Sequence, residues 1–250
     1  MKLIAIFARV RIRGLSATGT AAALAAGTAC LAAGWTWLVM LLAFYVSSTL
    51  LSRFHTDAKR ERAGDIVEKG GDRDMWQVAA NGGVFTVLAV ASTVTHSPAF
   101  LGAGAGAIAA SAADTWATEI GLLSRQMPRS IVSMQHVPPG TSGGVTLAGL
   151  AGSFAGSAFI AIAAALLDWP SSASIAALVG GLGGSLVDSF LGATVQGRRW
   201  CAACGVGTER AVHGCGTTTL SAGGFNWIRN DLVNFFCSLT GAFLGYLIAS

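Results

Sequence analysis

Two long stretches of the chain contain no charged side chain, and their lengths indicate the fold class. Residues 14–52 and 75–113 each contain 39 residues without Asp, Glu, Lys or Arg. Because a membrane-spanning helix needs roughly 20 apolar residues, each stretch predicts two spans folded back as a hairpin. Gly34 predicts the turn of the first hairpin, and His96-Ser97-Pro98 predicts the turn of the second.

The remaining apolar sequence predicts three further spans. A third hairpin runs from about Val145 to Val195 and turns at Asp168-Trp169-Pro170, and a last span covers about Asn226 to Ile248. The fold class is therefore all-α: a polytopic membrane protein of about seven transmembrane helices, in one domain over residues 1–250. Runs of Gly and Ala let the backbones approach closely, which predicts a tight bundle. A signal peptide is the alternative for the first span, but the uncharged stretch is long enough for two spans.

The basic residues predict the orientation. All 16 Lys and Arg residues fall in segments that this threading places on one side, namely the N-terminus, the loops 53–74, 124–144 and 196–225, and Arg229. By the positive-inside rule this side is the cytoplasm, so the N-terminus lies inside and the C-terminus outside. We assign the net charge of +4 to an inner rim that faces anionic lipid, and we expect no nucleic-acid partner.

One polar pattern, Ser-x-x-Asp-[Ser/Thr], occurs twice inside apolar spans that head toward the cytoplasm. The positions i, i+3, i+4 and i+7 share one helix face. The first copy fills them with Ser111, Asp114, Thr115 and Thr118, and the second copy fills them with Ser185, Asp188, Ser189 and Gly192. The two copies run in the same direction, which predicts an internal parallel repeat.

The depth of the two aspartates indicates a function. Asp114 lies 11 residues before Arg125, and Asp188 lies 10 residues before Arg198, so each carboxylate is about 15 Å below the first inner arginine. Inserting a carboxylate at mid-bilayer costs about 2.5–3.5 kcal/mol. The alternative is a polar helix–helix contact, which Ser or Thr provides without a charge. Glu119 points about 140° away from Asp114, and its role in the site is left open.

A stripe of polar side chains runs from the first loop into the third span. Lys69, Arg73, Gln77 and Asn81 recur every four residues, so two cations and then two amides point toward the buried carboxylates. Such a stripe suits a phosphate chain. Membrane-anchoring cations on a surface face are the alternative for Lys69 and Arg73, but this does not account for a buried Asn81.

Two further segments carry polar groups at the cytoplasmic ends of spans. The loop Gly140-Thr141-Ser142-Gly143-Gly144 precedes the fifth span, where backbone N–H groups and the helix N-terminus could bind an anion. A helix cap by Thr141 or Ser142 is the other interpretation. In the last span, Asn226, Asn230 and Asn234 share one face beside Asp231, and three such amides in an apolar helix indicate a site.

Four soft metal ligands cluster in the last loop. Cys201, Cys204, His213 and Cys215 form the pattern Cys-x2-Cys-x8-His-x-Cys. In a reducing compartment structural disulfides are rare, and a tetrahedral Zn²⁺ could bind these side chains. Because the spacing matches no standard zinc finger, free thiols or a redox pair stay open as alternatives.

With these residues assembled, the chain resembles an integral-membrane family that includes the plant phytyl-phosphate kinase of tocopherol synthesis and a widespread animal transmembrane protein. More distantly it resembles CTP-using polyprenol kinases and phosphatidate cytidylyltransferases. The Cys/His cluster departs from the pattern of many relatives. The motifs that carry the resemblance are Gly71-x-Arg73-x3-Gln77-Val-x-Ala-Asn81-Gly82-Gly83, Ala113-Asp114-Thr-x-Ala-Thr118-Glu119-Ile-Gly121, Pro139-Gly140-Thr-x-Gly143-Gly144, Gly184-Ser185-x2-Asp188-Ser-x-Leu-Gly192-Ala-x2-Gln196 and Asn230-Asp231-x-Val-Asn234.

The resemblance implies a kinase that converts a prenyl monophosphate to the diphosphate with a nucleoside triphosphate, CTP being the expected donor, and Mg²⁺. Asp114 and Asp188, with Asp231 as a third candidate, would hold Mg²⁺. Lys69 and Arg73 would bind the nucleotide phosphates, and the glycine-rich loop would bind one phosphate through backbone amides. Asn81, Asn230 and Asn234 would position the acceptor phosphate. Glu119, Gln77, Ser111, Thr118 and Ser185 complete the predicted site.

Two other functions compete with the kinase. Buried carboxylates and glycine-broken helices also occur in transporters and lipid flippases, which would carry an anionic or isoprenoid substrate. The predicted outer connections are only a few residues long and carry no matching motif, which argues against an outer opening. An inert membrane scaffold stapled by zinc is the third function, and it leaves the repeated carboxylates without a purpose.

Overall fold

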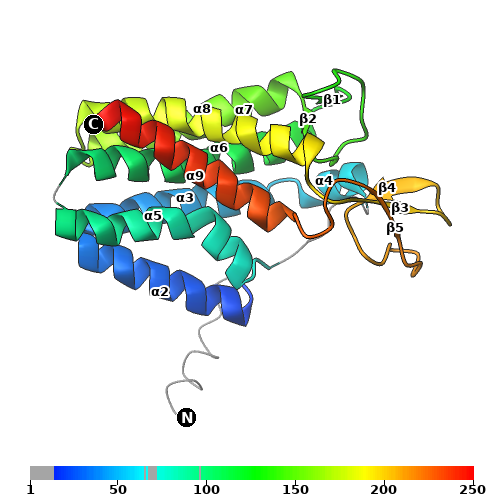
Figure 1. Ribbon diagram of the computed structural model, residues 1–250, viewed down its shortest axis with the longest axis horizontal. Coiled ribbons are helices and arrows are strands. Elements are labelled where there is room, and N and C mark those ends of the chain that lie inside the picture. The colour runs from blue at the N-terminus through cyan, green and yellow to red at the C-terminus, as the bar shows by residue number, and fades with distance from the viewer. Residues whose placement is uncertain (1–13, 65, 67–71, 96) are drawn as a thin grey trace, which may run out of the picture.

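The apolar stretches fold into long helices that run back and forth along one axis (Figure 1). The structure is a computed structural model, and it describes residues 14–64, 66, 72–95 and 97–250. In these ranges the helices are α2 (Ala17–Ala33), α3 (Trp35–Arg53), α4 (Thr56–Ala63), α5 (Met75–Thr95), α6 (Pro98–Leu123), α7 (Leu147–Leu166), α8 (Ser171–Thr194) and α9 (Asn230–Ala249).

Local sequence sets the ends of these helices. The Ser16 hydroxyl accepts the N–H of Gly19 at 3.1 Å and caps α2, and Thr146 caps α7 in the same way through Gly149. Gly34 joins α2 to α3 with a φ of 149°. The predicted turn at Asp168-Trp169-Pro170 joins α7 to α8, because Pro170 has no backbone N–H with which to continue the hydrogen bonds of α7.

The outer faces of the helices are apolar. Large side chains such as Val87, Val94 and Leu166 are 68%, 78% and 79% exposed, which is the surface expected of a protein that contacts lipid tails. Among the described residues, α3, α5, α7, α8 and α9 are the five helices long and apolar enough to cross a membrane. α2 has 17 residues, slightly fewer than the roughly 20 that a span needs. The threading of seven spans and the internal repeat therefore stay predictions.

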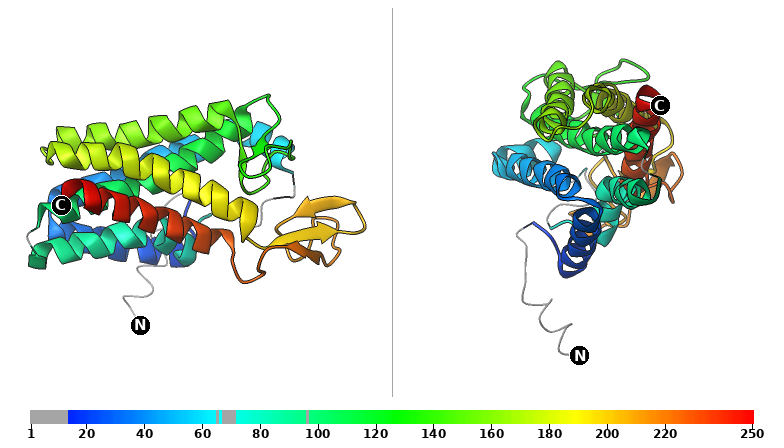
Figure 2. Two further views of the ribbon diagram at one scale, coloured as in Figure 1. Left: turned by 45° about the horizontal axis from the view of Figure 1, so that its top comes forward. Right: turned by 90° about the vertical axis from the view of Figure 1, so that its left-hand side faces the viewer.

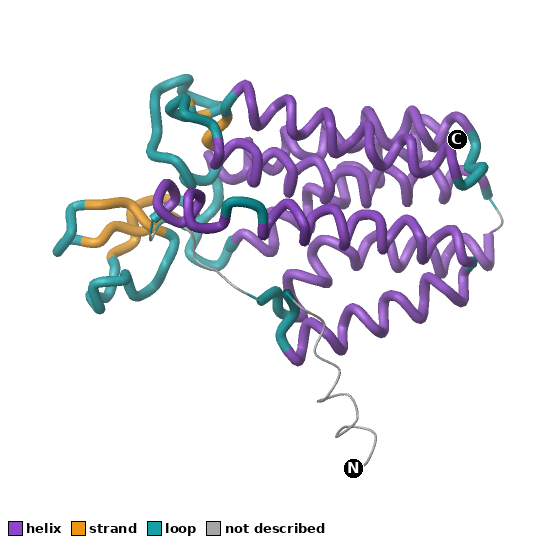
Figure 3. Tube along the Cα trace, turned by 180° about the vertical axis from the view of Figure 1, so that it is seen from behind, coloured by secondary structure: helices purple, strands orange, loops and turns teal. Residues whose placement is uncertain are grey.

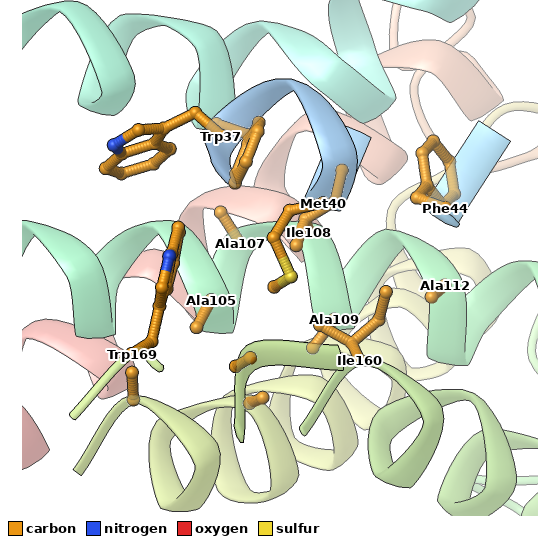
Figure 4. Close-up of a cluster of buried hydrophobic side chains, with 14 of the residues drawn as sticks. Trp37, Met40, Phe44, Ala105, Ala107, Ile108, Ala109, Ala112, Ile160 and Trp169 are labelled. Atoms are coloured by element: carbon orange, nitrogen blue, oxygen red, sulfur yellow. The ribbon is translucent and has the colours of Figure 1, made fainter. Parts of the chain in front are cut away.

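α6 lies at the centre of the bundle. It is buried continuously from Gly102 to Ala113 and packs against α7, α8 and α9. On its α3 side, the Trp37 indole lies over Gly104 and makes ring contacts with Phe85 at 5.0 Å and Trp169 at 4.9 Å (Figure 4). Because Gly and Ala fill most of α6, large side chains reach its backbone from the neighbouring helices.

Small residues fix how α6, α8 and α9 meet. A Cβ on Gly180 would lie 2.9 Å from the Cα of Gly106, and one turn further Gly184 faces Ala110. On the other side, Gly241 of α9 lies against Gly106, so its backbone touches that of α6. Close backbone approach at glycine is the usual way to pack transmembrane helices tightly.

The all-α prediction needs a correction in the loops. Two short antiparallel sheets form there, a pair of β1 (Arg129–Ser130) with β2 (Gly144–Val145), and a three-stranded sheet in the order β4 (Val206–Thr208), β3 (Arg198–Cys201) and β5 (Leu220–Gly223). Both sheets and α4 gather at one end of the bundle, opposite the C-terminus (Figures 2 and 3). The strands form because these loops leave the apolar bundle and must pair their backbone groups with each other.

Candidate functional site

A cavity of about 670 Å³ opens at the end of the bundle where the loops gather. Most of the predicted site residues line it. They are Arg73, Gln77, Asn81, Asp114, Thr118, Glu119, Gly140, Thr141, Ser142, Gly143, Gly144, Ser185, Asp188, Asn230, Asp231 and Asn234. Ser111 is buried beside this wall, where its hydroxyl donates to the carbonyl of Asn81 at 2.8 Å. Lys69 lies outside the described residues.

The parallel packing of α6 and α8 brings two aspartates together. The two helices stay in register over successive turns: Gly180 meets Gly106, and Gly184 meets Ala110. One turn further along each helix are Asp188 and Asp114. Their carboxyl groups lie close together on the wall of the cavity. Asp188 Oδ2 is buried and has no hydrogen-bond partner in the part of the chain that the structure describes. A buried carboxylate oxygen of this kind can accept a metal ion or a hydrogen-bond donor.

A third carboxylate, which the sequence analysis missed, approaches this pair from the last loop. Glu209 follows β4, and the Ser142 hydroxyl donates a hydrogen bond to Glu209 Oε1. The negative charge of Glu209 acts on Asp188. Glu209 lies in a polar loop and not inside an apolar span, so its sequence context does not mark it as buried. What sets it apart in the sequence is its place between the predicted metal ligands Cys204 and His213.

The glycine-rich loop is held between α8 and this carboxylate. A Cβ on Gly143 would lie 2.6 Å from the carbonyl oxygen of Ser189, so only a glycine allows the loop to sit on α8. The buried Gln196 amide donates to the Ser142 hydroxyl at 2.9 Å. The loop is therefore held by contacts with α8, Gln196 and Glu209.

A second polar network lies on the opposite side of the cavity. Lys59 of α4 forms a 2.6 Å ion pair with Glu119, and the Ser52 hydroxyl donates to the same carboxylate at 2.7 Å. Arg73 Nη2 donates to Ser52 at 3.3 Å. Lys59 is only 6% exposed, and it was not among the predicted site residues. Glu119 points away from Asp114, and in that direction its charge is balanced by Lys59.

The amide stripe on α5 is partly engaged within its own helix. Gln77 Oε1 accepts the N–H of Asp74 at 3.1 Å, and Asn81 Nδ2 donates to the carbonyl of Gln77 at 2.9 Å. Both side chains still line the cavity together with Arg73. From the other wall, Asn230, Asp231 and Asn234 come from the first turns of α9.

The cavity also has an apolar branch between α2 and α3. Leu24 and Leu31 of α2, together with Leu15 just before this helix, line one side of the branch, and Leu38 and Leu41 of α3 line the other. α2 begins beside Arg73, since the N–H of Ser16 donates to the carbonyl of Arg73 at 3.0 Å. From Leu15 to Leu31 the branch follows α2 for about 24 Å. The cavity therefore joins a polar end to a long apolar groove.

Acidic side chains outnumber basic ones on the described wall of the cavity. Five carboxylates line the cavity, namely Asp114, Glu119, Asp188, Glu209 and Asp231. Among the described residues that line it, Arg73 is the one basic side chain. Lys59 balances Glu119. An anionic ligand beside Asp114 and Asp188 would be repelled unless a cation accompanies it.

The predicted soft ligands meet in the loop that carries Glu209. Ligand atoms of Cys201, Cys204, His213 and Cys215 all lie within 4.8 Å of one another. Hydrogen bonds with Thr217 and His213 lower the pKa of the Cys215 thiol to about 6, while its hydrogen bond with Cys215 raises the pKa of Cys204 to about 11. The lowered pKa favours the thiolate form of the Cys215 side chain.

Comparisons with known proteins agree with an integral membrane protein. Residues 1–242 match the family described as "Integral membrane protein DUF92". The chain is 33% identical to Protein PGR of Arabidopsis thaliana over 85% of this chain and 81% of that protein. It is 29% identical to an uncharacterized membrane protein of Methanocaldococcus jannaschii over 65% of this chain and 66% of that protein. No solved structure matches. The chain therefore belongs to the DUF92 family of integral membrane proteins, as its motifs predicted.

Proposed function

We propose that this protein transfers the γ-phosphate of a nucleoside triphosphate, CTP being the expected donor, to a prenyl monophosphate. The observation that carries the proposal is the pairing of Asp114 with Asp188 at the polar end of a cavity that continues as an apolar groove. A prenyl monophosphate has the matching shape, with an apolar tail and an anionic head. The resemblance to phytyl-phosphate and polyprenol kinases supports the same reaction.

The donor set fits a magnesium ion. Mg²⁺ binds carboxylate oxygens and water, and it bridges phosphate oxygens in kinase sites. Asp114 and Asp188 would hold it, since Asp188 Oδ2 is a buried oxygen without a hydrogen-bond partner among the described residues. Glu209 and Asp231 line the same cavity. When bound, Mg²⁺ supplies the positive charge that lets phosphates enter a wall rich in carboxylates.

The remaining polar groups suit the phosphates. The Arg73 guanidinium can donate two hydrogen bonds to one phosphate. The loop Gly140–Gly144 precedes the N-terminus of α7, where the helix dipole favours an anion. The loop is already fixed on α8, so binding costs little ordering. Asn230 and Asn234 of α9 would orient the acceptor phosphate from the opposite wall.

The transfer itself needs little acid–base chemistry. An oxygen of the prenyl monophosphate forms a bond to the γ-phosphorus, and the bond from that phosphorus to the β–γ bridging oxygen breaks. The products are a prenyl diphosphate and a nucleoside diphosphate. Because the acceptor oxygen is already ionised at neutral pH, the protein contributes positioning and charge neutralisation rather than a strong general base.

In the proposed orientation this site opens to the cytoplasm, which contains the nucleoside triphosphates. With seven spans and the N-terminus inside, the loops 53–74, 124–144 and 196–225 lie in the cytoplasm, and the C-terminus lies outside. The polar end of the cavity then opens to cytoplasmic nucleotide. The apolar groove lies at the level of the lipid, from which a prenyl chain can enter between α2 and α3.

A donor–acceptor screen on purified protein in detergent tests the proposal. CTP, ATP, GTP and UTP are each combined with phytyl and geranylgeranyl monophosphate, with Mg²⁺ or with EDTA, and the diphosphate product is measured by mass. We expect Mg²⁺-dependent product with at least one pair. Nucleotide-independent flux of prenyl phosphate in proteoliposomes, without diphosphate in any combination, would instead support the transporter.

A further inference from the structure

We propose that Cys201, Cys204, His213 and Cys215 bind one Zn²⁺, and that this ion holds Glu209 in the cavity. The four ligand atoms lie within 4.8 Å of one another, although the ligands come from two segments separated by β4. Cys201 and His213 are buried, and Cys204 and Cys215 are exposed at the edge of the sheet. Three thiols and one imidazole are a standard ligand set for structural zinc.

The spacing of the ligand atoms matches a tetrahedral site. With Zn–S bonds of about 2.3 Å and Zn–N bonds of about 2.0 Å, sulfur atoms lie about 3.8 Å apart and sulfur and nitrogen about 3.6 Å apart. The Sγ atoms of Cys201 and Cys215 are 3.6 Å apart, and His213 Nδ1 is 3.3 Å from Cys215 Sγ. Both distances are within a few tenths of an ångström of those values, and the four ligand atoms all lie within 4.8 Å of one another, so movements of about 1 Å bring the whole set to tetrahedral spacing.

The backbone turns around the ligands are built alike. The N–H of Gly205 donates to the carbonyl of Cys201 at 2.9 Å, and the N–H of Gly216 donates to the carbonyl of His213 at 2.8 Å. Each glycine follows a cysteine and has a positive φ, 66° at Gly205 and 84° at Gly216. A left-handed residue at this place lets the chain turn back so that both ligands of a pair point to one centre.

A redox pair explains less of this geometry. A dithiol switch needs two cysteines, whereas here a third cysteine and a histidine converge on the same point. All of the cluster's cysteines are free thiols. A redox pair of Cys201 and Cys204 would leave His213 and Cys215 unused, whereas a zinc site uses all four ligands.

The metal site is joined to the cavity through Glu209. This residue lies between Cys204 and His213 in the sequence, and its backbone N–H donates to the carbonyl of Ile66 at 2.8 Å. Its carboxylate accepts a hydrogen bond from Ser142 of the glycine-rich loop. Because the sheet β4–β3–β5 is small, a zinc ion would add stabilisation to this segment. The metal site does not depend on the kinase proposal.

Metal analysis of the purified protein tests the inference. Protein purified in detergent under reducing conditions with zinc in the medium should contain one zinc per chain by mass spectrometry. The Co²⁺-substituted protein should show the absorption of tetrahedral thiolate coordination. Cys204→Ser and Cys215→Ser should each lower the zinc content by at least half, and Cys30→Ser, a buried cysteine of α2, should leave it at one.

The link to Glu209 is tested by limited proteolysis. Removal of zinc with a chelator should expose the segment from Arg198 to Arg210 to trypsin at least several-fold faster, while the helices stay intact. Zinc below one tenth per chain in folded wild-type protein would overturn the metal site, as would full zinc retention in a variant lacking Cys204 and Cys215. An unchanged cleavage rate after complete zinc removal would overturn its positioning role.

Discussion

At the scale of single residues, the pairing of Lys59 with Glu119 is the contact with the clearest energetic consequence. Their side chains are only 7% and 18% exposed, and the ion pair measures 2.6 Å. Ser52 donates a second hydrogen bond to Glu119. A buried pair is not strongly stabilising as a whole, but removal of one partner leaves an uncompensated charge.

Replacement of Lys59 by Met should therefore destabilise the protein by about 3 kcal/mol, which corresponds to a melting temperature lower by roughly 6–12 °C. The double variant Lys59→Met/Glu119→Gln should regain most of the loss, since no charge is then left unpaired. Thermal unfolding in detergent measures both. A single variant as stable as the wild type would show that Glu119 does not rely on Lys59.

The depth of a carboxylate was predictable from the sequence, whereas its partners were not. Asp114 and Asp188 stand out because a charge inside an apolar span is costly, and both line the cavity. Glu209 and Lys59 lie in polar loops, where charged residues are ordinary. Their burial results from tertiary contacts, of Lys59 with Glu119 and of Glu209 with Ser142 in the glycine-rich loop. The periodicity of apolar residues along the sequence does not predict such contacts.

At the scale of helices and strands, glycine contacts decide how the bundle packs. Gly241 of α9 lies against the backbone of Gly106 and against Ala110 of α6. This contact also sets the level of Asn234, about two turns along α9, beside the carboxylates. The packing of small residues thus positions the polar wall.

A methyl group at this contact should disturb the bundle. Gly241→Ala should cost on the order of 1–3 kcal/mol, because the added carbon overlaps α6. Gly83→Ala is the matched control, since nothing lies within 4 Å of the added carbon, and it should leave the stability unchanged or raise it by up to about 1 kcal/mol. The melting temperatures of both variants in detergent provide the comparison, and equal effects would contradict the packing.

Helices and their turns followed closely from the apolar pattern, but the loop structure did not. Gly34 and Asp168-Trp169-Pro170 lie at the predicted turns, and the last helix begins at Asn230, four residues after the predicted start. The strands β1 to β5 and the helix α4 were not predicted. β1 pairs with β2, β5 pairs with β3 and α4 packs against α6, each across a longer stretch of sequence, whereas β3 and β4 form a local hairpin of only a few residues.

At the scale of the whole molecule, the position of the loops makes a prediction about orientation. α4 and both sheets lie at one end of the bundle, and the C-terminus lies at the other end (Figure 1). If the basic loops face the cytoplasm, the C-terminus must face outward. The polar opening of the cavity then faces the cytoplasm as well.

Reporter fusions test this orientation in a bacterial host. Alkaline phosphatase fused after Ser250 should be active, because it folds only outside the cytoplasm, and the same enzyme fused after Gln135 should be inactive. Green fluorescent protein at the two positions should give the opposite pattern. An active phosphatase after Gln135 would place the glycine-rich loop outside and remove the access of the cavity to cytoplasmic nucleotide.

The central claim is that Asp114 and Asp188 act together in phosphate transfer, and one rate comparison tests it most directly. The measurement is Mg²⁺-dependent formation of prenyl diphosphate from CTP by the wild type, by Asp188→Asn and by Asp168→Asn, a control in the turn at the far end of the bundle. We predict that Asp188→Asn is slower by at least about 100-fold at unchanged melting temperature, and that Asp168→Asn retains the full rate. A well-folded Asp188→Asn variant with the wild-type rate would contradict the account.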